Sequence, residues 1–464
     1  MAVERRASED RAAPGRSLGM LVVCLGVVLS SLDGAIVNVA LPSIAAALHA
    51  SPAASVWVAT AYLLAVIAGL LPFASLGEAV GYRRVYLGGM AVFLAGSLAC
   101  AVSPTLPALI AARVLQGLGG AAMISISMAL VRLLYPGPGL GRAVALYGMT
   151  AAAAMSFGPS VGAGILTLSA WPWLFAVNLP IGAAAMAIGL RRLPAGEGRG
   201  GRLDLPAAAL SAMMFVGVVS GVDALGRAGE AVRAFTLMAG GVVAGGVLAL
   251  RQRGKPAPLL PLDLLKFPAF ALAAATSVCT YACQAASFVA LPFLFEHGLG
   301  RSASATGLLM TPWPLMVVFA GPVSGRLADR LPGGAMTGAG AAVLCCGVVL
   351  LAFLPAHATS VDIVWRMLLC GAGMGLFQAP NNRALLTAAP AERTGAASGM
   401  VAVARMLGMA LGAATASMAL AAFGSRGATT ALDLAAALAG LGALFSLSRA
   451  ATGAPGRRSS EPAR

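Results

Sequence analysis

One carboxylic acid lies inside a long apolar stretch near the start of the chain. Asp33 occurs in the sequence LDGAIVN at residues 32–38, and apolar residues continue on both sides. A charged side chain at the centre of a bilayer costs roughly 2.5 to 3.5 kcal/mol on insertion scales. Asp33 must therefore face a polar cavity or stay protonated, which is what a proton carrier requires. The alternative is a structural acid paired with a neighbouring helix.

Two arginines occupy corresponding places in the two halves of the chain. Arg113 and Arg366 each lie in an apolar stretch that continues into glycines. At residues 113–120 (RVLQGLGG), the glycines allow another helix to approach while Arg113 and Gln116 face the interior. Arg113 could sense the protonation of Asp33 or exclude water, and a structural salt bridge is the alternative.

Acids and arginines also occur together in two loops. Glu78 precedes Arg83 and Arg84, and Asp329 lies between Arg326 and Arg330. Helix dipoles favour a carboxylate near a helix N-terminus, and arginines can bridge to another bundle, so such pairs could latch one side shut. A loop cluster of charges that is simply solvated is the alternative. The expected latch comprises Gly77, Glu78, Gly81, Arg83, Arg84, Gly325, Arg326, Asp329 and Arg330.

A proline between glycines marks another apolar stretch. Gly158, Pro159 and Gly162 predict a flat helix face with a kink, because Pro159 removes a backbone hydrogen bond. Tight packing explains this pattern as well as a gating role does. Further polar groups, among them Asn178 and Asn382, could either join helices or contact a solute. The expected substrate path comprises Asn38, Gln116, Gln284, Arg366, Gln378 and Asn381.

Composition excludes a water-soluble protein. Of the 464 residues 59% are apolar and 10% are charged, whereas a soluble domain carries roughly 25% charged residues. Apolar stretches of at least about 18 residues recur along the chain, about fourteen in all, each long enough to cross a bilayer as a helix. The stretches are continuous and lack the alternation of barrel strands, so the expected fold is an all-α integral membrane protein.

The positive charge is one-sided. Of the 31 Lys and Arg residues, about 24 fall on one side of the predicted spans and about four on the other. The formal charge of +15 therefore predicts cytoplasmic termini and contact with anionic lipid heads, and it argues against nucleic acid as a partner. Three arginines fall inside spans, namely Arg113, Arg366 and Arg405.

Two sequence patterns known from soluble enzymes occur in this chain, and we attribute both matches to chance. The G-x-S-x-G at residues 158–162 and a relaxed dinucleotide fingerprint at residues 117–122 both lie in apolar helices without a preceding strand. No Walker A sequence is present, so uphill transport must use an ion gradient or a partner. All three histidines map to outer loops, and we expect no metal site, no cofactor and no enzymatic activity.

An internal repeat organises the chain. Val39-Ala40-Leu41-Pro42 recurs about 250 residues later as Val289-Ala290-Leu291-Pro292, and Gly158-x-x-x-Gly162 recurs as Gly408-x-x-x-Gly412. The offset predicts two parallel six-helix halves with an inserted helix pair, a 6+2+6 arrangement of 14 helices. The expected segments are a cytoplasmic tail at 1–17, a first bundle at 18–192, a linker with the inserted pair at 193–267, a second bundle at 268–448 and a cytoplasmic tail at 449–464.

Together these motifs resemble the major facilitator superfamily, in its fourteen-helix drug:proton antiporter branch, over about residues 18–447. The resemblance rests on residues 32–42, the two loops at 77–84 and 325–330, Arg113-x-x-Gln116-Gly117, and Gly158-Pro159-x-x-Gly162. The segment Phe175-x-x-Asn178-x-Pro180-x-Gly182 is also typical of the branch. Three departures, Glu78 for Asp, Ala79 for Arg and Pro172 within a Trp-Arg-Trp motif, predict a weaker latch in the first half.

The resemblance implies a monomeric, proton-driven exporter of small amphipathic drugs or antibiotics in the plasma membrane, working by alternating access. Asp33 and Arg113 are then the proton-coupling candidates, and the motif at residues 158–162 favours antiport over uptake. Two alternatives remain open, an importer or symporter of a specific metabolite and a sensor or scaffold without flux. The identity of the substrate does not follow from the sequence, because one scaffold serves many compounds.

Overall fold

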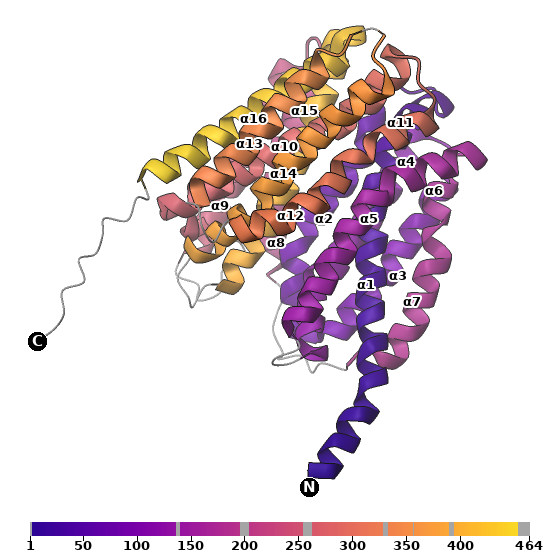
Figure 1. Cartoon of the computed structure of the whole chain (residues 1–464), viewed down its shortest axis with the longest axis vertical. Coiled ribbons are helices and arrows are strands. Elements are labelled where there is room, and N and C mark those ends of the chain that lie inside the picture. The colour runs from indigo at the N-terminus through magenta and orange to yellow at the C-terminus, as the bar shows by residue number, and fades with distance from the viewer. Residues whose placement is uncertain are drawn as a thin grey trace, which may run out of the picture.

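The computed structural model describes residues 2–135, 140–194, 204–253, 262–327, 333–355, 357–388 and 394–452. Within these ranges the chain forms helices and no strands (Figure 1). The first part contains α1 (Ala2–Ala47), α2 (Pro52–Val80), α3 (Tyr82–Ala101), α4 (Leu106–Leu134), α5 (Leu140–Leu168), α6 (Trp173–Ala176) and α7 (Asn178–Arg192). The middle contains α8 (Leu205–Ala224), α9 (Ala231–Gln252) and the short turn η2 (Leu262–Lys266). The last part contains α10 (Pro268–Phe293), η3 (Leu294–Gly298), α11 (Ala303–Met310), α12 (Pro312–Leu327), α13 (Gly333–Ala352), α14 (Ser360–Ala388), α15 (Thr394–Phe423), η5 (Gly424–Arg426) and α16 (Gly427–Thr452).

Several helices begin where the sequence supplies a capping side chain. Ser51 and Thr105 accept backbone N–H bonds from residues three positions on, at 3.2 and 3.4 Å, and Asp204 does the same for α8 at 3.1 Å. A proline follows each cap within the first helical turn, where its missing N–H has no partner to lose. These capping residues fix where α2, α4 and α8 leave the loops.

Within the described ranges, twelve helical segments are long and apolar enough to cross a membrane, and a thirteenth is added if the bent pair Leu146–Met155 and Phe157–Leu168 in α5 counts as one span. The bend lies beside Pro159, as expected for a proline inside a helix. Large apolar side chains on the outside, such as Phe235, Phe319 and Leu444, are between 63% and 64% exposed. Apolar residues facing outward in this number are what a lipid surround requires.

The helix contacts of the first bundle recur in the second, and glycines make both sets possible. A Cβ atom on Gly119 of α4 would lie 2.6 Å from the carbonyl oxygen of Gly89 in α3, and one on Gly373 of α14 would lie 2.7 Å from that of Gly340 in α13. Likewise α5 packs on α1, and α15 packs on α10 through Gly412. These positions are about 250 residues apart in sequence, so the repeated sequence motifs correspond to repeated helix contacts.

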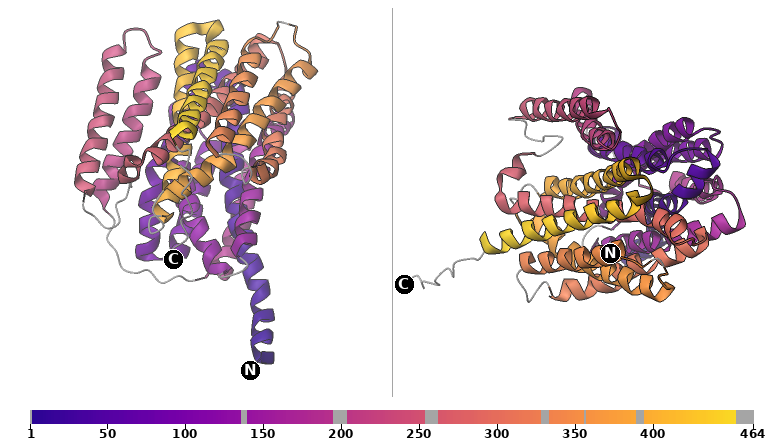
Figure 2. Two further views of the ribbon diagram at one scale, coloured as in Figure 1. Left: turned by 60° about the vertical axis from the view of Figure 1, so that its left-hand side comes forward. Right: turned by 90° about the horizontal axis from the view of Figure 1, so that it is seen from above.

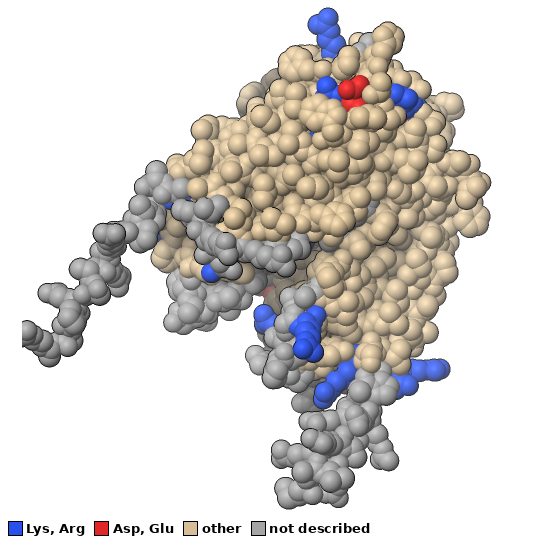
Figure 3. Space-filling model, in the orientation of Figure 1, with Lys and Arg blue, Asp and Glu red and all other residues tan. Residues whose placement is uncertain are grey.

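The two bundles are packed together at one end of the molecule and separated at the other. At the packed end, a continuous apolar core contains Ile36 and Val39 of α1, Leu291 of α10 and Trp313 of α12. The hydroxyl groups of Ser160 and Thr311 lie 2.6 Å apart across the same contact. The other end, where α1 begins and α16 ends, we call the terminal end. Figure 3 shows the surface hollowed between the bundles toward it.

Helices α8 and α9 form a separate layer beside the bundles (Figure 2). Asp223, 3% exposed near the end of α8, connects this layer to both halves. Its carboxylate accepts a 3.0 Å bond from Trp57 Nε1 of α2 and a bond from the Ser417 hydroxyl of α15, and it pairs with Arg227 at 2.7 Å. Helix α8 is therefore fastened to both α2 and α15 by one buried acid.

We expect Asp223→Ala to destabilise the protein by about 2 to 4 kcal/mol, because it leaves the partly buried Trp57 N–H unpaired and removes one of the two acidic partners of Arg227. Glu230→Ala is the matched control, since Glu230 also pairs with Arg227 but is about one-third exposed. Thermal unfolding in detergent, followed by tryptophan fluorescence, measures both variants. Equal midpoints for the two would show that Asp223 does not anchor α8.

Candidate functional site

Both oxygens of the Asp33 carboxylate are bound by side chains of other helices. Asp33 is 1% exposed in the middle of α1. Its Oδ2 accepts a bond from Arg113 Nη1 of α4, in a fully buried ion pair. Its Oδ1 accepts bonds from Gln116 Nε2 at 2.8 Å and from Asn178 Nδ2 of α7 at 3.0 Å. The acid predicted from the sequence is therefore paired with a cation and enclosed by α1, α4 and α7.

The Arg113 guanidinium is surrounded on all sides. Its Nε donates to the Val58 carbonyl oxygen at 2.9 Å, and Nη1 also donates to Gln116 Oε1. The Tyr62 ring lies 4.3 Å from Cζ and the Phe175 ring 5.6 Å, so the cation is held against two aromatic faces. These contacts together compensate for removing the charge from water.

A serine forms the base of the same network. Ser97 Oγ of α3 accepts from Gln116 Nε2 at 2.8 Å and from Asn178 Nδ2 at 3.4 Å. Gly96, beside Ser97, makes this possible, because a Cβ there would lie 2.6 Å from the Gln116 backbone. One acceptor, Asn178 Oδ1, is buried without a hydrogen-bond partner among the described residues. The network thus retains one unused acceptor next to Asp33.

The sequence indicated Asp33, Arg113 and Gln116 as functional residues, and the structure brings these three together. For Asn178 the sequence leaves two roles open, joining helices or contacting a solute, and the structure places it in the Asp33 network. Ser97 and Tyr62 were missed, because a serine and a tyrosine in apolar helices are too common to stand out. The position of Ser97 next to a glycine opposite Gln116 becomes informative only once the α3–α4 pairing is known.

The predicted substrate-path residues do not form one group. Gln378 of α14 donates to Tyr281 Oη of α10 at 3.0 Å, and Gln284 lies one turn from Tyr281. Asn381 instead joins helices, since its Nδ2 donates to Ser277 Oγ at 2.7 Å. Asn38 of α1 is partly buried.

Arg366 lies in the second turn of α14, where its partners are local. It donates to the Asp362 carbonyl at 2.7 Å, lies 3.7 Å from the Asp362 carboxylate, and has its Cζ 4.6 Å from the centre of the Trp365 ring. The correspondence with Arg113 is therefore one of sequence position alone, because the equivalent of Asp33 in the second half is Cys283.

The glycines of α5 face two different partners. A Cβ on Gly158 would lie 2.3 Å from the Cβ of Ala35, two residues from Asp33, and one on Gly162 would lie 3.3 Å from Ile36. On the other side, the carbonyl oxygen of Pro159 would lie 2.5 Å from a Cβ on Gly307 of α11. Helix α5 is thus in contact both with the helix that carries Asp33 and with the opposite bundle.

The first-half loop motif is fully described. Gly81 joins α2 to α3 with φ 104°, a conformation that favours glycine, and Gly77 is buried against Ile126. Arg83 donates to the Leu190 carbonyl oxygen, and Glu78 is exposed. In the second-half loop, Gly325 and Arg326 lie at the end of α12, and Asp329 and Arg330 lie outside the described residues.

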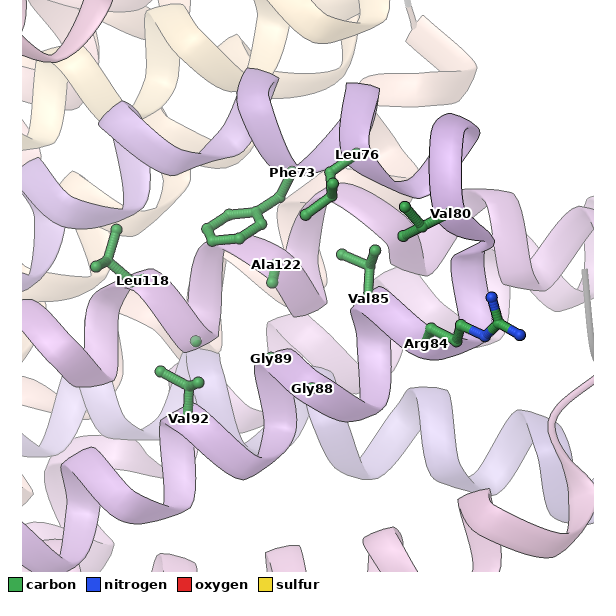
Figure 4. A pocket seen from close by; sticks show the side chains of 11 residues that line it. Phe73, Leu76, Val80, Arg84, Val85, Gly88, Gly89, Val92, Leu118 and Ala122 are labelled. Atoms are coloured by element: carbon green, nitrogen blue, oxygen red, sulfur yellow. The ribbon is translucent and has the colours of Figure 1, made fainter. Parts of the chain in front are cut away.

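Arg84 borders a pocket on the outside of the first bundle (Figure 4). Its lining comes from α2, α3 and α4 and is otherwise apolar, including Phe73, Leu76 and Val92. Figure 4 shows the Arg84 side chain directed away from this lining. The pocket does not lie between the bundles, so we do not place the substrate there.

Comparison with known proteins agrees with this architecture. The sequence model of the Major Facilitator Superfamily matches residues 23–413. An uncharacterized transporter of Escherichia coli, YebQ, is 42% identical over 93% of this chain and 95% of its own length. The riboflavin transporter RibZ of Clostridioides difficile is 30% identical, over 85% and 86%. The multidrug resistance protein Stp of Mycobacterium tuberculosis is 31% identical, over 88% and 76%.

The family of the chain follows from its helical architecture, from the sequence match over most of its length and from these relatives. The chain belongs to the Major Facilitator Superfamily, and it is a multi-pass membrane transporter of small molecules rather than an enzyme.

Proposed function

We propose that the protein is a proton-coupled antiporter that exports small amphipathic molecules, including drugs or antibiotics, from the cytoplasm. The observation that carries the proposal is the buried pair of Asp33 and Arg113, a titratable acid in the middle of a bundle. A multidrug resistance protein among the relatives supports the efflux direction, and the glycine motif of α5 favours antiport.

The argument for proton coupling is the free-energy cost of protonating Asp33 while Arg113 stays charged. If Asp33 took up a proton in the present arrangement, Arg113 would remain as an uncompensated buried cation, which costs about 3 to 5 kcal/mol. Protonation must therefore accompany a rearrangement in which Arg113 gains another partner or water. Asn178 Oδ1, the unused acceptor in the network, can receive a bond from a protonated Asp33.

Alternating access requires that this rearrangement reach the contact between the bundles. Helix α5 contacts α1 at Ala35 and contacts α11 at Gly307. A shift of α1 on protonation of Asp33 would displace α5 and open the closed end. With cytoplasmic termini, as the arginine distribution predicts, the hollow at the terminal end makes this the inward-open state. The exposed Glu78, with Arg83 and Arg84, then belongs to a latch that is open here.

The proposed architecture is fourteen crossings in a 6+2+6 order. The segment Gly399–Arg449, counted once among the twelve candidate spans, is 51 residues long and contains both α15 and α16. A single crossing needs only about 20 residues, so this segment supplies two, and the bent α5 supplies one more. The bundles would be residues 18–192 and 268–448, and the inserted pair would lie within 193–267 in a monomer of the plasma membrane.

Asp33→Asn is expected to abolish proton release evoked by substrate, because asparagine cannot exchange a proton and leaves Arg113 without its anionic partner. The measurement uses inverted membrane vesicles, a pH-sensitive dye, and a panel of cationic, neutral and anionic dyes and antibiotics. Asp362→Asn, at a carboxylate that is 40% exposed, is the control and should behave like the unchanged protein. An unchanged response in Asp33→Asn would move proton coupling elsewhere, and uptake with no export would favour the metabolite importer.

Gly158→Ala is expected to reduce export at least about tenfold, since the new methyl group would meet Ala35 and overpacking of this kind costs roughly 1 to 3 kcal/mol. Gly164→Ala is the matched control in the same helix, where a Cβ meets no atom within 4 Å. Initial rates of dye efflux from cells at equal expression compare the two. Similar rates would contradict a coupling role for the contact between α5 and α1.

A further inference from the structure

One positive charge between the bundles has no acid beside it. Arg405 lies in α15 within the apolar segment Gly399–Arg449 and is partly exposed. Its Nε is buried without a hydrogen-bond partner, and the described part of the chain offers it no ion pair. An unpaired guanidinium at membrane depth is unfavourable unless an anion or water joins it.

Helix packing directs this arginine toward the path between the bundles. Gly408 and Gly412, one and two turns further along α15, pack on Val278 and Ala282 of α10. Residues three positions apart share a helix face, so Arg405 emerges next to this contact. Ala402 and Met406 meanwhile pack against the core of the first bundle. A Cβ on Gly408 would lie 3.0 Å from the Cβ of Tyr281, so this tyrosine of α10 lies beside the same contact.

The surroundings of Arg405 combine hydrogen-bonding groups with aromatic faces. Tyr281 accepts from Gln378 at 3.0 Å, and its ring meets Phe377 edge to face with centroids 5.8 Å apart. Gln284, on the same helix, is 9% exposed, and its Oε1 has no partner among the described residues. This side of the path thus offers a cation, an unused amide and aromatic rings, which together suit an amphipathic ligand.

The two buried acids among the described residues, Asp33 and Asp223, have other partners. Asp33 is occupied by Arg113, Gln116 and Asn178, and Asp223 by Arg227, Trp57 and Ser417. Glu78 lies in the last turn of α2, at the terminal end, and is exposed. The field at Arg405 is therefore positive, which attracts an anion and repels a cation.

We propose that Arg405 binds an anionic group of the transported molecule, so that the cargo class is amphipathic organic anions with an aromatic body. Tyr281, Gln378 and Gln284 would contact that body. The proposal rests on the proposed transport function and names the substrate class that this function leaves open.

The test compares two dyes with the same xanthene frame, anionic fluorescein and cationic rhodamine 123, binding to the purified full chain in detergent. Fluorescence anisotropy should give tighter binding of fluorescein. Arg405→Gln should weaken fluorescein binding at least about tenfold and leave rhodamine 123 unchanged or tighter, and Arg405→Lys should restore part of the loss. Arg366→Gln, which removes an arginine that is paired with Asp362 on its own helix, is the control and should alter neither.

The proposal would be overturned if the ratio of the two dye affinities were the same in the Arg405→Gln variant as in the unchanged protein. It would also be overturned if fluorescein did not bind. Thermal unfolding of each variant verifies that it is folded. Proton release in vesicles separates this proposal from the transport function. Export of rhodamine 123 with proton release but without fluorescein binding would retain antiport and reject the anion site. Fluorescein binding that depends on Arg405, without any proton release, would retain the site and reject antiport.

Discussion

A carboxylate and a guanidinium share a space from which water is excluded, and neither can be stable there alone. The Asp33–Arg113 pair therefore determines what the neighbouring helices must supply. Gln116 and Asn178 donate to the acid, Val58 accepts from the cation, and the Tyr62 ring covers it. These groups come from three helices, α2, α4 and α7, so the ion pair and the bundle are stable only together.

Glycines make that arrangement sterically possible. Gly96 brings α3 against Gln116, and Gly158 brings α5 against α1 beside the acid. Close backbone contacts leave little freedom for side chains to adjust independently, so helices shift as packed units. The same packing recurs in the second bundle, but there the chemistry differs. Cys283 stands where the first half has Asp33, and Arg405 stands where it has Met155. The acid and the unpaired cation consequently belong to opposite halves.

Much of this organisation could be predicted from the sequence, and the limits have physical causes. Asp33, Arg113 and Gln116 stand out because polar groups in apolar helices are costly, and repeated glycines indicate which faces approach. Arg366 was less informative, because its spacing of four residues from Asp362 already places the two charges on one helix face as a local pair. Ser97, Tyr62 and the surroundings of Arg405 depend on helix rotation and on contacts between helices far apart in sequence, which residue type alone does not encode.

The attachment of α8 through Asp223 has a consequence for the route by which hydrophobic compounds could reach the path. The bundles meet along two lateral seams, one between α2 and α15 and the other between α5 and α12. Among the described helices, α8 packs on both α2 and α15 and so shields the first seam from the acyl chains. A molecule dissolved in the bilayer leaflet can then reach the path from one side of the transporter only, along the uncovered seam between α5 and α12.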